Sequence, residues 1–172
     1  MMSGDTKDHN KEPSVFVCPD RYTGSSLSVF LAGGITDCPD WQTYMKDKIV
    51  KDLPGLIVLN PRRASFDVTN KSALKEQITW EYDALRQAEL ILFWFPKGPS
   101  VCPIALFELG TWSIKHIHHC NNIIVGCDPE YKRREDVETQ LHLVMGDHFV
   151  VHSTLDELFG AMQKYFESLF EF

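Results

Sequence analysis

One carboxylate, Glu108, lies where its surroundings suggest chemistry. If residues 103–118 form a helix, the positions three and four residues from Glu108 are mostly apolar: they hold Ile104, Ala105, Thr111 and Trp112. A carboxylate on such a face must find hydrogen-bonding partners or keep its proton to a higher pKa. Because the segment follows a strand and a Pro/Gly-rich loop, we interpret Glu108 as a candidate catalytic residue. A structural glutamate bonded to a nearby loop is the alternative.

A second carboxylate, Asp83, lies on a helix predicted over residues 71–88. This helix leads into the strand that precedes the Glu108 loop, so we expect the two acids to approach one another near the sheet edge. Two carboxylates that face one sugar suit glycosyl transfer, in which one attacks the anomeric carbon and the other manages protons or binds a hydroxyl group. A solvated helix surface is the competing interpretation of Asp83.

Other side chains also lie where a ligand would bind. Trp41 and Phe95 could stack on a planar base, although aromatic residues of strands are often core residues. The pair Gly33-Gly34 allows a tight turn but is too short for a dinucleotide-binding fingerprint, and no Walker A sequence occurs. An arginine of residues 60–63 (NPRR) could meet a phosphate or a carboxylate, or be solvated.

A histidine and cysteine cluster at residues 116–120 (HIHHC) suggests a metal site. On a helix, His116, His119 and Cys120 would share one face, and histidine and cysteine are zinc ligands. The sequence offers no carboxylate partner and no second cluster for them. We therefore expect neither a metal nor any other cofactor.

The elements that must position these residues alternate between strands and helices. Apolar runs predict five buried strands, at residues 27–32, 56–59, 90–95, 122–126 and 149–152. Helical spacing predicts helices at residues 40–53, 71–88, 103–118 and 137–145, and a last one that begins near residue 154. A short β-rich stretch at residues 15–18 precedes them, and residues 1–14 have the composition of a disordered tail. The pattern predicts one doubly wound α/β domain over residues 15–172, with a parallel sheet.

Spacing also predicts the buried helix faces and the ligand loops. The expected core stripe of residues 71–88 is Leu74, Ile78, Tyr82 and Leu85. That of the last helix is Leu155, Leu158, Phe159, Met162, Phe166 and Leu169. Ligands of doubly wound sheets bind beyond the carboxyl ends of the strands, where the strand order reverses. The expected site loops are residues 33–40, 60–70, 96–103 and 126–130.

Composition restricts the class of protein and of partner. The chain has 172 residues, 44% of them hydrophobic, and a formal net charge of −7. These values describe an ordinary globular domain and argue against a nucleic-acid polymer or an anionic membrane as partner. The apolar runs are too short to span a membrane. Five irregularly spaced cysteines and the lack of a secretory segment lead us to expect a cytoplasmic location.

Five segments together resemble the nucleoside 2-deoxyribosyltransferase family, most closely its 2-deoxyribosyltransferase-like branch. They are residues 29–35 (VFLAGGI), 60–62 (NPR), 80–85 (WEYDAL), 93–96 (FWFP) and 107–110 (FELG). The resemblance covers roughly residues 27–151. Its most specific part is the Glu-Leu-Gly element, which follows the aspartate-bearing helix.

The resemblance implies a flavodoxin-like, three-layer α/β/α fold with a five-stranded sheet. It assigns Glu108 as the nucleophile that attacks C1′ of a 2′-deoxynucleoside, and Asp83 as the residue that contacts the sugar hydroxyl and assists proton transfer. The expected substrate-binding residues are Gly33, Gly34, Trp41, Asn60, Arg62, Trp80, Phe95 and Cys102. Cys102 and Phe30 replace an aspartate and a tyrosine of the family's transferases. Since a neighbouring subunit completes the family's sites, we expect a dimer or a larger homo-oligomer.

We therefore expect an enzyme that transfers a deoxyribosyl group from a 2′-deoxynucleoside to a free nucleobase. Two alternatives stay open. In the first, water replaces the acceptor base, which gives a 2′-deoxynucleoside or 2′-deoxynucleoside 5′-monophosphate hydrolase. In the second, the chain is a catalytically silent nucleotide-binding module, which the replacements at Cys102 and Phe30 would explain.

Overall fold

The fold is built on one parallel sheet. The computed structural model describes residues 14–65, 67, 69–117 and 122–169. In chain order its strands are β1 (Val15–Val17), β2 (Ser28–Gly33), β3 (Ile57–Asn60), β4 (Leu90–Phe95), β5 (Asn122–Cys127) and β6 (Val151–His152). Its helices are α1 (Trp41–Asp52), α2 (Lys71–Gln87), α3 (Pro103–Ile117), α4 (Arg134–Met145) and α5 (Leu155–Ser168). Nearly all of the expected tail, residues 1–13, lies outside the described residues.

The sheet has six strands, so the expectation of five is wrong. The strand order is β1-β3-β2-β4-β5-β6. The additional strand, β1, is three residues long and pairs with β3, with Val15 opposite Val58. So short an apolar segment has no periodicity from which its place at the sheet edge can be predicted. The other five strands have the flavodoxin-like order, in which the chain moves outward from β2 to β3 and then crosses back to β4.

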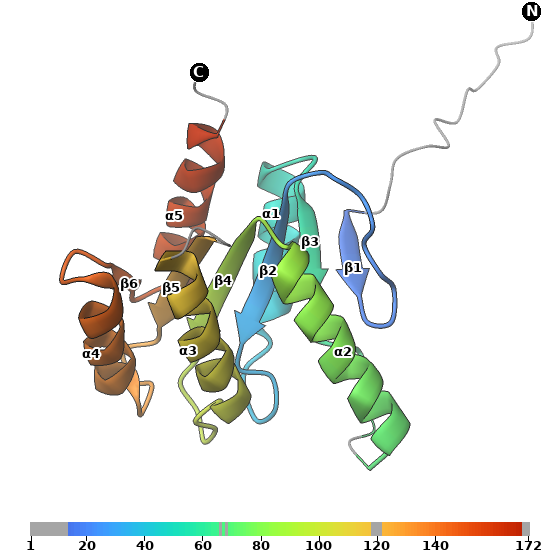
Figure 1. Cartoon of the computed structure of the whole chain (residues 1–172), viewed down its shortest axis with the longest axis horizontal. Helices are drawn as coiled ribbons and strands as arrows, with labels where there is room; N and C mark the ends of the chain where they lie inside the picture. Colours follow the sequence, from blue (N-terminus) through green and yellow to red (C-terminus); the bar gives the residue numbers. More distant parts are fainter. Residues whose placement is uncertain (1–13, 66, 68, 118–121, 170–172) are drawn as a thin grey trace, which may run out of the picture.

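Helices cover both faces of the sheet and form the expected three layers (Figure 1). On one face, Met45 of α1 and Leu158 of α5 belong to a single buried cluster with the strands. On the other face, a second cluster includes Trp80 of α2, Leu109 of α3 and Leu141 of α4. All six residues of β4 are buried, because β4 lies between the two clusters. This burial on both faces explains why the strands are continuous apolar runs.

The buried face of α2 differs from the predicted one. Its buried residues are Gln77, Trp80, Ala84 and Leu85. The other three members of the expected stripe are exposed: Leu74, Ile78 and Tyr82. The helix has two apolar faces, and spacing alone does not tell which one packs on the sheet. In α5, by contrast, the predicted stripe is confirmed at Leu158, Phe159, Met162 and Phe166.

Helix ends follow ordinary capping chemistry. The side chains of Asp40, Asn70 and Thr154 accept backbone N–H bonds in the first turns of α1, α2 and α5. Helix α4 begins at Arg134, earlier than the predicted residue 137. Within the described ranges, no helix is long and apolar enough to cross a bilayer.

Candidate active site

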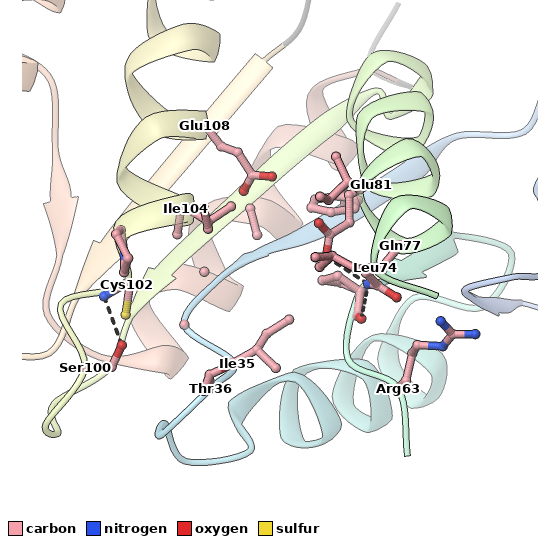
Figure 2. Close-up of a pocket in the computed structure, with 18 residues that line it drawn as sticks. Ile35, Thr36, Arg63, Leu74, Gln77, Glu81, Ser100, Cys102, Ile104 and Glu108 are labelled. Carbon is pink, nitrogen blue, oxygen red and sulfur yellow. Dashed lines mark hydrogen bonds between the residues drawn. The ribbon is translucent and has the colours of Figure 1, made fainter. Parts of the chain in front are cut away.

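A cavity of about 390 Å³ lies at the carboxyl ends of β2 and β4, between α2 and α3 (Figure 2). The chain leaves β2 and β4 in opposite directions, so this is the crevice where doubly wound sheets bind ligands. The segments after β2, β3 and β4 contribute to its wall, as expected, whereas residues 126–130 do not. Much of the wall is apolar, with Phe30, Leu74, Ile78 and Ile104 among its residues. Its size and lining suit a small organic ligand.

Glu108 points from α3 into this cavity (Figure 2). In the part of the chain that the structure describes, no hydrogen bond or ion pair holds its carboxylate. Burial, and next the negative charge of Glu81, raise the pKa of Glu108 from its ordinary 4.5 to about 8. The carboxyl group therefore keeps a proton in the free protein at neutral pH. A raised carboxyl pKa in a cavity is a feature of functional sites.

The second carboxylate of the cavity is Glu81, from α2. Figure 2 shows Glu81 and Glu108 on facing helices, with open space between them. Burial raises the pKa of Glu81, while a hydrogen bond from Gln77 opposes this effect. The Gln77 Nε2 atom donates to Glu81 Oε1 at 2.8 Å and to the backbone oxygen of Pro61 at 2.9 Å. Gln77 thus fixes the orientation of Glu81 relative to the end of β3.

Asp83, the second acid expected from the sequence, lies elsewhere. Its carboxylate forms an ion pair with Arg21 at 3.4 Å, and both side chains are about half exposed or more. It is absent from the residues that line the cavity. Successive helix residues are about 100° apart, so two residues further along α2 the side chain points away from Glu81. The structure brings Glu81, and not Asp83, toward Glu108.

Comparison with known proteins identifies the family of the chain. A family model described as nucleoside 2-deoxyribosyltransferase like matches residues 26–131, which is more than half of the 172-residue chain. The chain belongs to this family. No curated protein sequence matches the chain. The segment that matches the nucleoside 2-deoxyribosyltransferase-like family contains β2 to β5, and with them every residue of the cavity wall.

Three expected substrate-binding residues of this nucleoside 2-deoxyribosyltransferase-like chain line the cavity: Gly33, Gly34 and Cys102. Three others are buried and do not line the cavity. Trp41 Nε1 donates to the oxygen of Gly34 at 3.0 Å, and Trp80 Nε1 donates to the oxygen of Asp20 at 2.8 Å. Phe95 is fully buried and packs on neighbouring rings of the core. Trp41, Trp80 and Phe95 are therefore core residues in the structure.

Asn60 and Arg62 do not line the cavity. Instead, they bind the backbone of segments that form its wall. The Asn60 Oδ1 atom accepts the Arg62 backbone N–H at 3.0 Å. The Arg62 guanidinium donates to the Gln42 side chain at 2.9 Å and to the oxygens of Ile35 and Pro39 at 3.2 and 3.1 Å. Arg62 therefore ties the end of β3 to the segment between β2 and α1. Its donors are directed at this segment, and not into the cavity.

Sequence reasoning did not identify Gln77 and Glu81 as residues of the wall, and it considered Arg63 only as one of the two arginines of residues 60–63. Arg63 lines the cavity, but its guanidinium forms an ion pair with Glu76 at 3.2 Å and points away from the cavity in Figure 2. The spacing of Gln77 and Glu81, one helical turn apart, was the signal that could have identified them, because such a pair shares a helix face.

The expectation that no metal binds stays a prediction. The histidine and cysteine cluster falls largely outside the described residues, since residues 118–121 and the side chain of His116 are not described. Within the ranges that are described, no group of three or more His, Cys, Asp or Glu side chains could hold a metal ion.

Proposed function

We propose that the chain cleaves the N-glycosidic bond of a 2′-deoxynucleoside and transfers the deoxyribosyl group to another nucleobase. The observation that supports this proposal is the pair of carboxylates, Glu108 and Glu81, on facing walls of one largely apolar cavity. Family membership supports it as well, because the family is described by its likeness to nucleoside 2-deoxyribosyltransferases.

In the proposed reaction Glu108 is the nucleophile. Its carboxylate attacks C1′, the bond from C1′ to the base nitrogen breaks, and the sugar is held as an ester of Glu108. The departing base needs a proton, and a carboxyl pair that holds one at neutral pH can supply it. Attack by a second base on C1′ then breaks the ester and returns the carboxylate. We assign Glu81, in place of Asp83, to proton transfer or to the sugar hydroxyl.

Base exchange tests the reaction directly. The purified chain is incubated with deoxyinosine or thymidine and a second free base, and the products are separated by chromatography. We expect a new 2′-deoxynucleoside to form. In a companion experiment, a 2-fluoro-2-deoxyribosyl substrate should leave an adduct on Glu108 in the intact-mass spectrum. The proposal would be contradicted if no combination of donor nucleoside and acceptor base gave exchange or base release, and if no adduct formed.

Arg63 favours one alternative, a hydrolase that acts on 2′-deoxynucleoside 5′-monophosphates. Arg63 is a cationic residue of the cavity wall and guanidinium groups bind phosphate well, but its side chain must first turn from Glu76 toward the cavity. In this case water, and not a second base, breaks the Glu108 ester. Release of base without an added acceptor, faster from the monophosphate than from the nucleoside, would replace the transferase proposal by this one.

We also propose that a second copy of the chain covers the cavity. Large apolar side chains stand exposed on the two helices that flank it: Ile78 and Tyr82 on α2, and Ile104 and Phe107 on α3. Contiguous exposed apolar surface is typical of protein interfaces. Two of them, Ile78 and Ile104, also line the cavity. This position agrees with the family resemblance, which implies that a neighbouring subunit completes the site.

Replacing Phe107 by glutamate should dissociate this oligomer. Phe107 is 75% exposed in the single chain, so a charge there is tolerated by the monomer but is buried at an interface on α3. Light scattering after size exclusion should show a fall from the dimeric or larger mass to 19.7 kDa. Leu143→Glu on α4 is the matched control, because Leu143 is 77% exposed and is remote from the cavity wall. A monomeric wild-type chain would refute the proposed interface.

A further inference from the structure

Two thiols that the proposed reaction does not use meet at one end of the cavity. The Sγ atoms of Cys38 and Cys102 are 3.7 Å apart, although the residues are 64 positions apart in the chain. Cys38 lies in the turn between β2 and α1, and Cys102 lies between β4 and α3. Cys102 belongs to the cavity wall (Figure 2). The two segments that form this end of the site are therefore joined by a sulfur contact.

Separate contacts hold each thiol in this position. The Arg62 guanidinium donates to the backbone oxygen of Cys38 at 3.4 Å. The backbone N–H of Cys102 donates to Ser100 Oγ at 3.1 Å, and Cys102 has a φ of 49°, a conformation that residues with a side chain rarely adopt. Gly34 lies against both sulfurs: a Cβ there would be 2.5 Å from Cys38 Sγ and 2.7 Å from Cys102 Sγ. The backbone thus places the sulfurs side by side.

We propose that Cys38 and Cys102 form a reversible disulfide bond when the protein meets a hydroperoxide, and that this bond narrows the cavity. A disulfide bond is about 2.05 Å long, so the sulfurs must approach by roughly 1.7 Å. Both cysteines lie outside helices and strands, where side-chain rotation and small loop shifts can supply this movement. The bond draws the β2–α1 segment toward the β4–α3 segment. These two segments supply Thr36 and Ser100 to the cavity wall.

The oxidation proceeds in two balanced steps. Cys38 is half-buried and Cys102 is 5% exposed, so the peroxide meets Cys38 first. The Cys38 sulfur attacks a peroxide oxygen, the O–O bond breaks, and a sulfenic acid and one molecule of water (or alcohol) result. The Cys102 sulfur then attacks the Cys38 sulfur, the S–O bond breaks, and a second water leaves with the Cys102 proton. A dithiol reductant reverses the bond by thiol–disulfide exchange.

Burial, with the adjacent Cys38, raises the pKa of the Cys102 thiol to about 12. This thiol is therefore a poor first attacker, which agrees with its role in the second step. Among the four described cysteines, no other pair has its sulfurs in contact. Cys18 and Cys127 are each buried, and neither is expected to pair with the other thiols.

Peptide mapping of the full chain tests the bond. Reduced protein is treated with hydrogen peroxide without denaturant, alkylated and digested, and we expect a linked peptide that contains residues 38 and 102 and disappears with dithiothreitol. Because the link joins residues 64 positions apart, the melting temperature should rise by roughly 5–10 °C. Cys38→Ser and Cys102→Ser should each remove the linked peptide and the rise, whereas Cys18→Ser should keep both. A linked peptide that forms only after denaturation, or its absence, overturns the proposal.

The expected narrowing of the cavity can be tested without measuring turnover. Glu108 lines the cavity and keeps its proton at neutral pH, so a water-soluble carbodiimide with an added amine should label it. Labelling, mapped by mass spectrometry, should be at least several-fold slower in the oxidised protein and should recover after reduction. Equal labelling rates in the two forms would show that the bond leaves the cavity unchanged, and would overturn this part of the proposal.

Discussion

Replacing Glu108 by glutamine should lower the turnover of a 2′-deoxynucleoside by a factor of about 10³ or more, because removing a covalent nucleophile leaves no path to the ester. The same variant should show no adduct with the 2-fluoro-2-deoxyribosyl substrate. Glutamine keeps the size of the side chain, so the cavity and the fold should persist. Base exchange by Glu108→Gln at the wild-type rate would exclude Glu108 as the nucleophile.

The same substitution should stabilise the fold, and this effect is independent of turnover. Glu108 has a pKa of about 8 in the folded chain and an ordinary value of 4.5. At a pH between these two values, the folded state therefore retains a proton that the unfolded state has released. Wild-type stability therefore falls as pH rises from about 4.5 to 8. Because glutamine does not titrate, Glu108→Gln should be more stable than wild type at pH 8.5 by on the order of 2–3 kcal/mol, and nearly equal at pH 5.

Thermal unfolding at the two pH values measures this difference. The exposed Glu135 of α4 provides the control, because Glu135→Gln removes the same charge from a solvated surface. We expect the control to change the melting temperature little at either pH. A Glu108→Gln variant that is no more stable than wild type at pH 8.5 would show that the folded protein does not hold the Glu108 proton.

Glu81→Gln should reduce turnover by about 10²-fold, the usual contribution of a residue that transfers a proton. It should also move the pH profile. The charge of Glu81 raises the pKa of Glu108, so its removal lowers that pKa and shifts the ascending limb of kcat/KM toward lower pH. The other titratable or charged residues of the wall, Arg63 and Cys102, stay unchanged in this variant. A lower turnover, with the ascending limb of kcat/KM at the same pH as in the wild type, would indicate a structural role for Glu81.

Asp83→Asn is the matched control on the same helix. It removes a carboxylate whose ion pair with Arg21 lies outside the cavity wall, and exposed pairs of this kind contribute little to stability. We expect near-normal turnover and an unchanged pH profile. If Asp83→Asn were instead the slower variant and Glu81→Gln the normal one, the assignment drawn from the family resemblance would hold in place of ours.

Much of the fold follows from periodicity and apolar runs. Strands β2 to β5 are largely buried apolar segments because both faces of the sheet are covered, and the stripe of α5 packs as its spacing predicts. Two features escaped this reasoning for physical reasons. β1 has three residues and is defined by its pairing with β3, a contact between distant segments. Helix α2 is apolar on two sides, and tertiary packing selects the side with Trp80.

The site could be predicted in part. The apolar surroundings of Glu108 and the loop before its helix were sufficient to single it out, and the structure places it in the cavity. The partner acid was assigned to Asp83 from the position of its helix and from the family resemblance, and only the rotation of α2 distinguishes it from Glu81, two residues earlier. Arg62 illustrates another limit: its motif indicated a ligand-binding cation, whereas its guanidinium is bound by the protein backbone, Gln42 and Asp40.

The close fit of Gly34 against two sulfurs has a consequence for sequence divergence. Even the smallest side chain at position 34 would collide with both Cys38 and Cys102. An alanine there requires both sulfurs to rotate away or the cysteines to be replaced, so substitutions at these three positions are coupled. Among descendants of an ancestor with this arrangement, a larger residue at position 34 should occur mostly together with changes at positions 38 and 102.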